Sequence, residues 1–164
     1  MNINARLDEQ VTPVVAAAGL LLTSTLGDTT YVSMKGHSRA TIIITIADGT
    51  TVTGSTITLK QATAVAGTSE KALAFTRMLA NTDYAASKAL TETAVTSNTF
   101  TTQTTNSKDS LYIIDVDADS LDTANGFDCV RVDCTGHAAT ASRGCVVLYN
   151  LFGARYNGAN PLID

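Results

Sequence analysis

The sequence predicts an all-β protein: an antiparallel β-sandwich or jelly roll with extended N- and C-terminal segments. Thr is abundant, and its branched Cβ favours a pleated sheet with one solvated face. Several short stretches alternate between apolar and polar residues, and clusters of turn-forming residues separate them. With 164 residues, 45% of them hydrophobic, the chain is long enough to bury one core.

The clearest strand is expected at residues 40–46, where three alternate isoleucines share one face. Thr41, Ile43 and Thr45 share the other face, which is therefore only half apolar. Turn signals follow, and alternation resumes at residues 56–60. These two stretches are expected to form a hairpin-like pair with a generous loop.

Other strands are expected at residues 30–34, 110–116, 129–134 and 145–152, from the same alternation. Residues 69–79 have good helix formers and an acidic start, which allows a short helix, and a strand at 74–78 is the alternative. The polar, Thr-rich stretch 91–108 suits an exposed strand or a long loop.

Three regions are expected: an extended N-terminal segment (1–28), a β-sandwich domain (29–152) and an extended C-terminal tail (153–164). Both end segments carry apolar residues in stretches poorly patterned for a core within one chain. We therefore expect them to contact other subunits, and Arg155 and Tyr156 are of the types that anchor interfaces. The candidate interface residues are Val14, Val15, Leu20, Leu21, Leu22, Arg155, Tyr156, Pro161, Leu162 and Ile163.

The stretch "DVDADSLDTANG", from Asp115 to Gly126, places carboxylates at the first, third and fifth positions of a calcium-type loop. Such a loop requires Gly at position six and Glu at position twelve, where this chain has Ser120 and Gly126. A turn explains the same residues, with Asp119 or Ser120 capping one helical turn. We predict a turn; a weak ion site at residues 115–122 stays open.

Neither a metal site nor a catalytic site is expected. Cys129, Cys134 and Cys145 with His137 lack the close paired spacing of structural zinc sites, and Cys129 and Cys134 fall on opposite faces of one strand. No Gly-x-Ser-x-Gly elbow, phosphate-binding loop or dinucleotide fingerprint occurs. We predict packed free thiols, no cofactor and no enzymatic activity, with Arg131 as an ion-pair partner of Asp133 or Asp115.

Charge and hydropathy exclude two classes of partner. The net charge of −4 and the scattered Lys and Arg residues argue against nucleic acid. The apolar run 13–22 is too short to span a bilayer and follows acidic residues, so neither a membrane span nor a secretory signal is expected. Only 16% of the residues are charged, which indicates that much of the surface touches protein.

The sequence pattern of these strands resembles that of small virion structural proteins of tailed bacteriophages, most of all capsid decoration or cement proteins. The features that carry the resemblance run from about residue 29 onward: a "V-x-M-K" strand, a hydrophobic strand, an "I-T-L-K-Q-A" strand, "N-G-F-D-C-V-R-V" and a closing "R-Y". In this chain they lie at residues 32–35, 41–46, 57–62, 125–132 and 155–156.

The resemblance implies a homo-oligomer, a trimer by preference, that binds the major capsid protein on the capsid surface after synthesis in the bacterial cytoplasm. There it would stabilise the head by bridging capsomers. A head–tail (neck) or tail protein is the nearest alternative. A carbohydrate- or receptor-binding module is less favoured because the chain has no Trp, and a small Cys- or His-based hydrolase is the last alternative.

Overall fold

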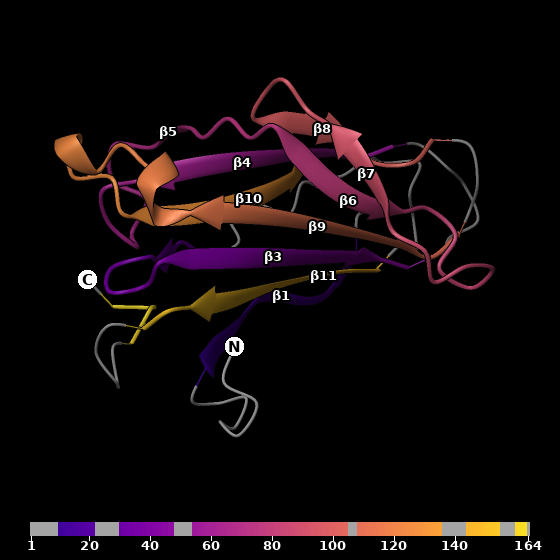
Figure 1. Ribbon diagram of the computed structural model, residues 1–164, viewed down its shortest axis with the longest axis horizontal. Helices are drawn as coiled ribbons and strands as arrows, with labels where there is room; N and C mark the ends of the chain where they lie inside the picture. The colour runs from indigo at the N-terminus through magenta and orange to yellow at the C-terminus, as the bar shows by residue number, and fades with distance from the viewer. Residues whose placement is uncertain are drawn as a thin grey trace.

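The computed structural model describes residues 10–21, 30–47, 54–104, 108–135, 144–154 and 160–163. Within these ranges the chain forms eleven strands and two short 3-10 turns (Figure 1). Every strand pairing in the described part is antiparallel. The prediction of an all-β chain with antiparallel sheets is confirmed.

The larger sheet has six strands in the order β1-β11-β3-β9-β6-β7. Its centre consists of long strands in which buried residues alternate with partly or fully exposed ones, so that one face of the sheet is turned toward the core. Shorter strands, β6 and β7, extend one side. The bounds are β1 (Val11–Leu21), β11 (Gly144–Phe152), β3 (Arg39–Ile46), β9 (Ser110–Asp117), β6 (Arg77–Asn81) and β7 (Thr91–Ala94).

The smaller sheet has the order β2-β10-β4-β5, and β8 also pairs with β4. Its two long strands lie side by side in a continuous register from Cys129 opposite Ala62 to Thr135 opposite Thr56. The bounds are β2 (Val32–Ser33), β10 (Cys129–Thr135), β4 (Thr56–Ala62), β5 (Lys71–Ala72) and β8 (Thr99–Thr101).

The strand pairs are nested along the chain and alternate between the sheets. The outermost pair, β1 with β11, lies in the larger sheet, and the next pair, β2 with β10, lies in the smaller one. The pair β3 with β9 returns to the larger sheet, and β4 pairs with β5 and β8 in the smaller sheet. The expected hairpin of residues 40–46 with 56–60 is therefore wrong, because β3 and β4 belong to different sheets and each finds its partner elsewhere in the chain.

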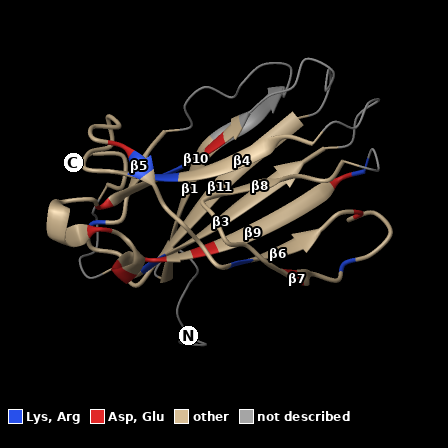
Figure 2. Cartoon of the chain, turned by 90° about the horizontal axis from the view of Figure 1, so that it is seen from above, with Lys and Arg blue, Asp and Glu red and all other residues tan. Residues whose placement is uncertain are grey.

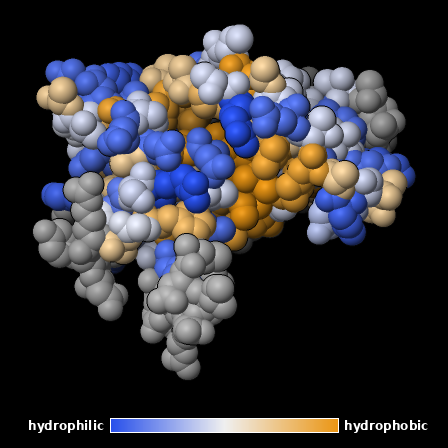
Figure 3. Space-filling model, in the orientation of Figure 1, coloured by the Kyte–Doolittle hydropathy of each residue, from blue (hydrophilic) through white to orange (hydrophobic). Residues whose placement is uncertain are grey.

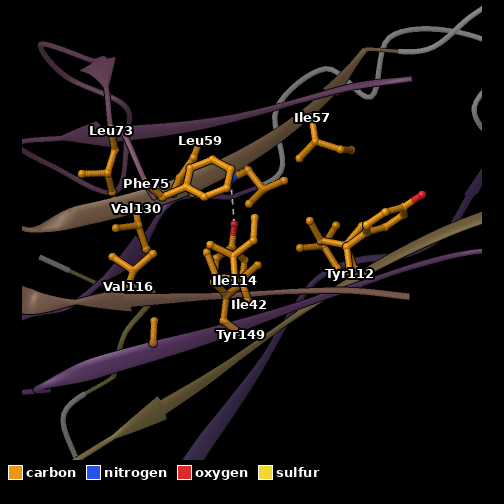
Figure 4. Close-up of a cluster of buried hydrophobic side chains, with 14 of the residues drawn as sticks. Ile42, Ile57, Leu59, Leu73, Phe75, Tyr112, Ile114, Val116, Val130 and Tyr149 are labelled. Carbon is orange, nitrogen blue, oxygen red and sulfur yellow. Dashed lines mark hydrogen bonds between the residues drawn. The ribbon is translucent and has the colours of Figure 1, made fainter. Parts of the chain in front are cut away.

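One main hydrophobic cluster contains side chains from both sheets. Ile42, Ile44 and Ile114 of the larger sheet are fully buried, as are Leu59 and Val132 of the smaller one. Figure 4 shows the inward side chains of this cluster converging between the strands. Burying each large aliphatic side chain contributes roughly 1.5–3 kcal/mol, so this cluster is the main source of the stability of the fold.

A hydrogen bond across the core joins the two sheets. The Val132 N–H in β10 donates to the Tyr149 hydroxyl of β11 at 2.8 Å, and the dashed line in Figure 4 marks this bond. Tyr149 is fully buried. A buried hydroxyl without a partner would cost free energy, so this bond fixes how Tyr149 crosses the core.

The expected boundary between the N-terminal segment 1–28 and the sandwich domain lies in the wrong place. Strand β1 pairs with β11 from Val11 opposite Phe152 to Leu21 opposite Gly144, with two register shifts. Residues 11–21 are thus an edge strand of the larger sheet. The β-branched pair at Val14 and Val15 suits a strand, and the turn clusters that would mark a linker are missing from this stretch.

The stretch 69–79 contains no helix. Lys71–Ala72 forms β5 and Arg77–Asn81 forms β6, so the strand alternative, expected at 74–78, is closer to the structure. Leu73 and Phe75 between these strands are buried in the main cluster. Their apolar side chains at alternate positions are drawn into the core, and this packing overrides the local helix propensity. In residues 91–108, β7 is exposed along its whole length, as expected for an outer strand.

The acidic stretch after β9 forms two 3-10 turns, at Ala118–Ser120 and Thr123–Asn125. The prediction of a turn is confirmed, but the predicted side-chain cap is wrong: Ser120 Oγ donates to the carbonyl of Asp117. Gly126 closes the second turn with φ of 80°, a left-handed conformation that Gly adopts without a steric penalty.

Candidate protein-interaction surface

The outward face of the larger sheet is apolar along its centre. In β3 and β9 the even-numbered residues are buried, so Ile43 and Ile113 point away from the core and are only half-buried. An outward face in solution normally carries polar residues at these positions. Apolar residues on both faces of the same strands make the outer face a candidate interaction surface.

The register places five of these side chains in one line across the sheet. Val15 of β1 lies opposite Leu148 of β11, and Leu148 lies opposite Ile43 of β3. Ile43 lies opposite Ile113 of β9, and Ile113 lies opposite Leu79 of β6. Directly opposite side chains are about 5 Å apart at Cβ, so the five form a continuous apolar row. Figure 3 shows an orange, hydrophobic area over part of β9, β3 and β11.

A second line of residues widens the apolar row toward one end of the strands. Val146 lies opposite Thr45, and Thr45 lies opposite Leu111. Together with Tyr84 and Gly144 they line a shallow hollow of about 600 Å³. The lining is mostly apolar, which suits a side chain of another protein better than a charged ligand.

Charged residues lie on the other side of the apolar row, toward the opposite end of the strands. Arg39 at the start of β3 lies opposite Asp117 at the end of β9. The guanidinium of Arg39 also lies 5.1 Å from the centre of the Phe152 ring. Asp115 accepts a hydrogen bond from the Thr41 hydroxyl. Figure 2 shows the same division, with β3 and β9 uncharged along most of their length and charged toward this end.

The outward face of the smaller sheet is built differently, around a polar cluster of Tyr31, Lys60, Glu70, Arg131 and Asp133. Arg131 Nε lies 2.7 Å from Asp133 Oδ1 and its Nη2 lies 3.1 Å from Glu70 Oε2. Lys60 Nζ lies 2.9 Å from Glu70 Oε1 and 3.0 Å from Asp133 Oδ2. The Tyr31 hydroxyl donates to Glu70 at 2.9 Å, and the Arg131 guanidinium lies 4.5 Å from the centre of the Tyr31 ring.

The polar cluster shifts the proton affinities of its own members. The hydrogen bonds from Lys60 and Tyr31 lower the pKa of Glu70, and the bonds to Glu70 and Asp133 raise the pKa of Lys60. Burial, with the bond to Glu70, raises the pKa of Tyr31. Two cations face two carboxylates, so the charges balance within the cluster. The predicted ion pair of Arg131 with Asp133 is confirmed, whereas Asp115 lies on the other sheet.

The candidate interface residues predicted from the sequence are only partly gathered on one surface. Val15 is 61% exposed and belongs to the apolar row, but Val14 is buried in the main cluster, so an interface role for Val14 is wrong. Leu20 and Leu21 lie in β1. Leu22, Arg155 and Tyr156 lie outside the described residues.

The three candidate residues in the described end of the tail also differ in burial. Pro161 is buried, and its carbonyl accepts a hydrogen bond of 2.8 Å from the Ser33 N–H of β2. Leu162 and Ile163 are 46% and 64% exposed. The tail is therefore attached to the smaller sheet at Pro161 and presents two apolar side chains beyond it.

Most residues of the apolar row are not among the candidates from the sequence. Ile43, Ile113, Leu148 and Leu79 lie within regular strands, where alternation predicts only one core-facing side. The sequence nevertheless indicates an apolar outer face, because apolar residues occupy both odd- and even-numbered positions of residues 41–46 and 111–116. That pattern is typical of strands covered on both faces.

The three cysteines are free and buried. Cys134 belongs to the main cluster, while Cys129 packs with Tyr31 and Ala62 on the other side of β10, as the alternation predicts. Its neighbour Cys145, together with burial, raises the pKa of the Cys134 thiol. Among the described residues, no three His, Cys, Asp or Glu side chains are grouped so that they could hold a metal ion.

The comparisons with known proteins give no further lead. No protein-family model matches the chain, no curated protein matches it, and no solved structure matches it. Within the ranges that the structure describes, no helix has the length and apolar character that crossing a membrane requires.

Proposed function

We propose that this protein is a structural component of a bacteriophage virion, and that it is a capsid decoration protein which binds the major capsid protein and stabilises the head by bridging capsomers. The observation that carries the proposal is the apolar row on the outward face of the larger sheet, which favours a protein of an assembly whether another copy of the chain or the shell covers the row. A surface of this kind is completed by another protein. A decoration protein works through such contacts, repeated over many copies, and each contact can therefore be modest.

The nested strand pairs support a finer description of the fold, a jelly-roll β-sandwich. A jelly roll is one long antiparallel hairpin whose successive strand pairs alternate between two sheets, and viral capsid domains use this architecture. In this chain the pairs β1·β11, β2·β10, β3·β9 and β4·β5/β8 follow that order. In this description β6 and β7 are an added hairpin at the edge of the larger sheet.

The tail supports contact with a shell. Leu162 and Ile163 are exposed just beyond Pro161, which anchors the tail to β2. In our proposal these two side chains, together with Arg155 and Tyr156, bind the capsid surface. Residues of this kind add affinity when they fill pockets on the partner.

The test of the virion role is the position of the protein in phage particles purified from infected cells. Quantitative mass spectrometry should find it at a copy number comparable with that of the major capsid protein, and antibody labelling should place it on the head. A copy number that fits only a single ring of subunits in each particle would indicate a neck protein instead. Complete absence from the particles would reject a virion role.

The role of the tail needs a variant that leaves β2 intact. Deleting residues 153–164 would remove the Pro161 carbonyl that Ser33 needs, so the sharper variant is the double substitution Leu162→Ser with Ile163→Ser. We expect it to reduce binding to shells at least about tenfold, because two buried apolar contacts are lost. Leu90→Ser, at an exposed residue of the β6–β7 loop, is the control and should bind normally.

A further inference from the structure

We propose that a second copy of this chain covers the apolar row, so that two larger sheets pack face to face about a two-fold axis. The axis runs parallel to the strands and passes between β3 and β9. This inference rests on the proposed function in one respect, since it names the partner of the same face. It assigns that face to the contact between two copies of the chain, so that the tail is the segment that binds the shell.

The size of the face suits a stable dimer. Its six strands span about 24 Å at about 4.8 Å per spacing, and its eight-residue strands are about 27 Å long. The footprint is therefore roughly 650 Å² per copy, close to the roughly 800 Å² per partner of a specific interface. Sheets that pack in this way lie about 10 Å apart with their mean strand directions within about 30° of each other.

The apolar row is arranged symmetrically about the boundary between β3 and β9. On one side lie Ile43 and then Leu148, and on the other side lie Ile113 and then Leu79. A two-fold rotation about this boundary brings Ile43 against Ile113 of the second copy, and Leu148 against its Leu79. Side chains of matched size thus meet at the four central positions, as a two-fold contact requires, whereas Val15 of β1 comes to lie against β7 near Glu92.

The border charges select the same axis. Arg39 of β3 and Asp117 of β9 face each other across the boundary at one end of the face, and both are exposed. Rotation about the boundary brings Arg39 toward Asp117 of the second copy, twice per dimer. An axis along β3 would instead oppose two arginines, and an axis along β9 would oppose two aspartates. Like charges in such positions are strongly disfavoured.

A two-fold contact of this kind closes on itself. Both copies use the same surface, so association stops at the dimer, and the four central residues of the apolar row are covered. A trimer, which the resemblance to decoration proteins implies, needs two different surfaces on each copy. The oligomeric state therefore separates the two geometries.

The closing experiment exchanges the border charges between chains. Arg39→Asp and Asp117→Arg are purified separately, and sedimentation equilibrium measures the dimer dissociation constant of each. Each variant alone should dimerise at least about tenfold more weakly than the wild type, because both of its junctions then oppose like charges. An equal mixture of the two should restore wild-type affinity, since the carboxylate introduced in one chain then meets the guanidinium introduced in the other. Intrachain neighbours cannot produce this rescue.

A second pair of variants tests the apolar row itself. Ile113→Ser places a polar group at the centre of the contact and should make the protein monomeric at concentrations where the wild type is dimeric. Leu90→Ser, outside the row, should leave the dimer intact. Circular dichroism checks that each variant is folded.

Three results would overturn the inference: a wild-type chain that stays monomeric, a trimer, or a charge mixture that associates no better than its components. The outcome is independent of the test in phage particles. A monomer found on virions removes the inference and keeps the proposed function, whereas a dimer absent from virions does the reverse.

Discussion

The outer faces of the two sheets differ in whether their side chains find partners within the same chain. On the smaller sheet, Arg131 is almost buried and its charge is matched by Asp133 and Glu70 in the same chain. On the larger sheet, Ile43 and Ile113 stand in the centre of an outward face, beside other apolar side chains of the same layer. The first face stabilises the folded chain, and in our proposal the second stabilises an assembly. The difference is the reason why we propose the larger sheet, and not the smaller one, as the interaction surface.

The largest expected effect compares two adjacent residues of β3. Ile44→Ala should lower the free energy of unfolding by about 3 kcal/mol, because Ile44 is fully buried and its loss leaves a cavity. Ile43→Ala should cost less than about 1 kcal/mol, because Ile43 is half-buried on the outward face. Urea unfolding at low protein concentration measures both. Equal losses would show that the outward face belongs to the core of the single chain.

The next effect concerns the polar cluster. Arg131→Met should cost about 2 kcal/mol, since it leaves two carboxylates, Asp133 and Glu70, facing one cation, Lys60. The matched control is Arg77→Met, whose ion pair with Glu92 is 3.7 Å long and exposed, and which should cost less than about 0.5 kcal/mol. Similar losses at the two sites would contradict the view that the polar cluster is a stabilising unit.

A smaller effect is expected at Tyr31. Tyr31→Phe removes the hydroxyl that donates to Glu70 and keeps the ring that Arg131 contacts, so it should cost about 1 kcal/mol. Tyr84→Phe, on the exposed β6–β7 loop, keeps the ring that Lys88 contacts and should be neutral. Thermal unfolding of the two variants gives the comparison. A neutral Tyr31→Phe would mean that Lys60 and Arg131 already satisfy Glu70.

The smallest effect is the pH dependence of the polar cluster. The pKa of Glu70 is lowered in the folded chain, so below its ordinary value of about 4.5 the unfolded chain binds more protons. The stability that Glu70 contributes is therefore present above that pH and is lost as the pH falls through the folded pKa. Glu70→Gln should flatten this part of the stability curve, which urea unfolding at a series of pH values measures. The pKa of Asp122 is also lowered, by its hydrogen bond from Lys71, so Asp122 still contributes to the loss of stability at acid pH in the Glu70→Gln variant.

The strands themselves can be predicted from the sequence because alternation is a local signal. The strands expected at residues 110–116, 129–134 and 145–152 each lie within two residues of the observed bounds. Pairing is not predictable in the same way. Short-range reasoning joins residues 40–46 to 56–60, but the structure pairs β3 with β9 and β11, whose residues are more than sixty positions away.

The surface is harder to predict than the fold, for a related reason. The sequence places Val15 at an interface because its segment resembles a loose terminus, whereas Val15 lies on the apolar face because that segment is a strand. Apolar residues at both odd- and even-numbered positions of residues 41–46 indicate a strand covered on both faces, but they do not show which outward side chains meet. An apolar row exists only once five strands are in register, so no single stretch of sequence reveals it.

The nested order of the strands also governs when the chain can fold. Val11 pairs with Phe152, so the first strand of the larger sheet has no neighbour until the last one has left the ribosome. At about 5–20 residues per second this wait is on the order of ten seconds. During that time the strands that will line the core lack their long-range partners, and closure of such distant contacts is slow. A nascent chain of this design depends on its final strand, and any truncation before residue 144 would leave β1 and β3 open to other proteins.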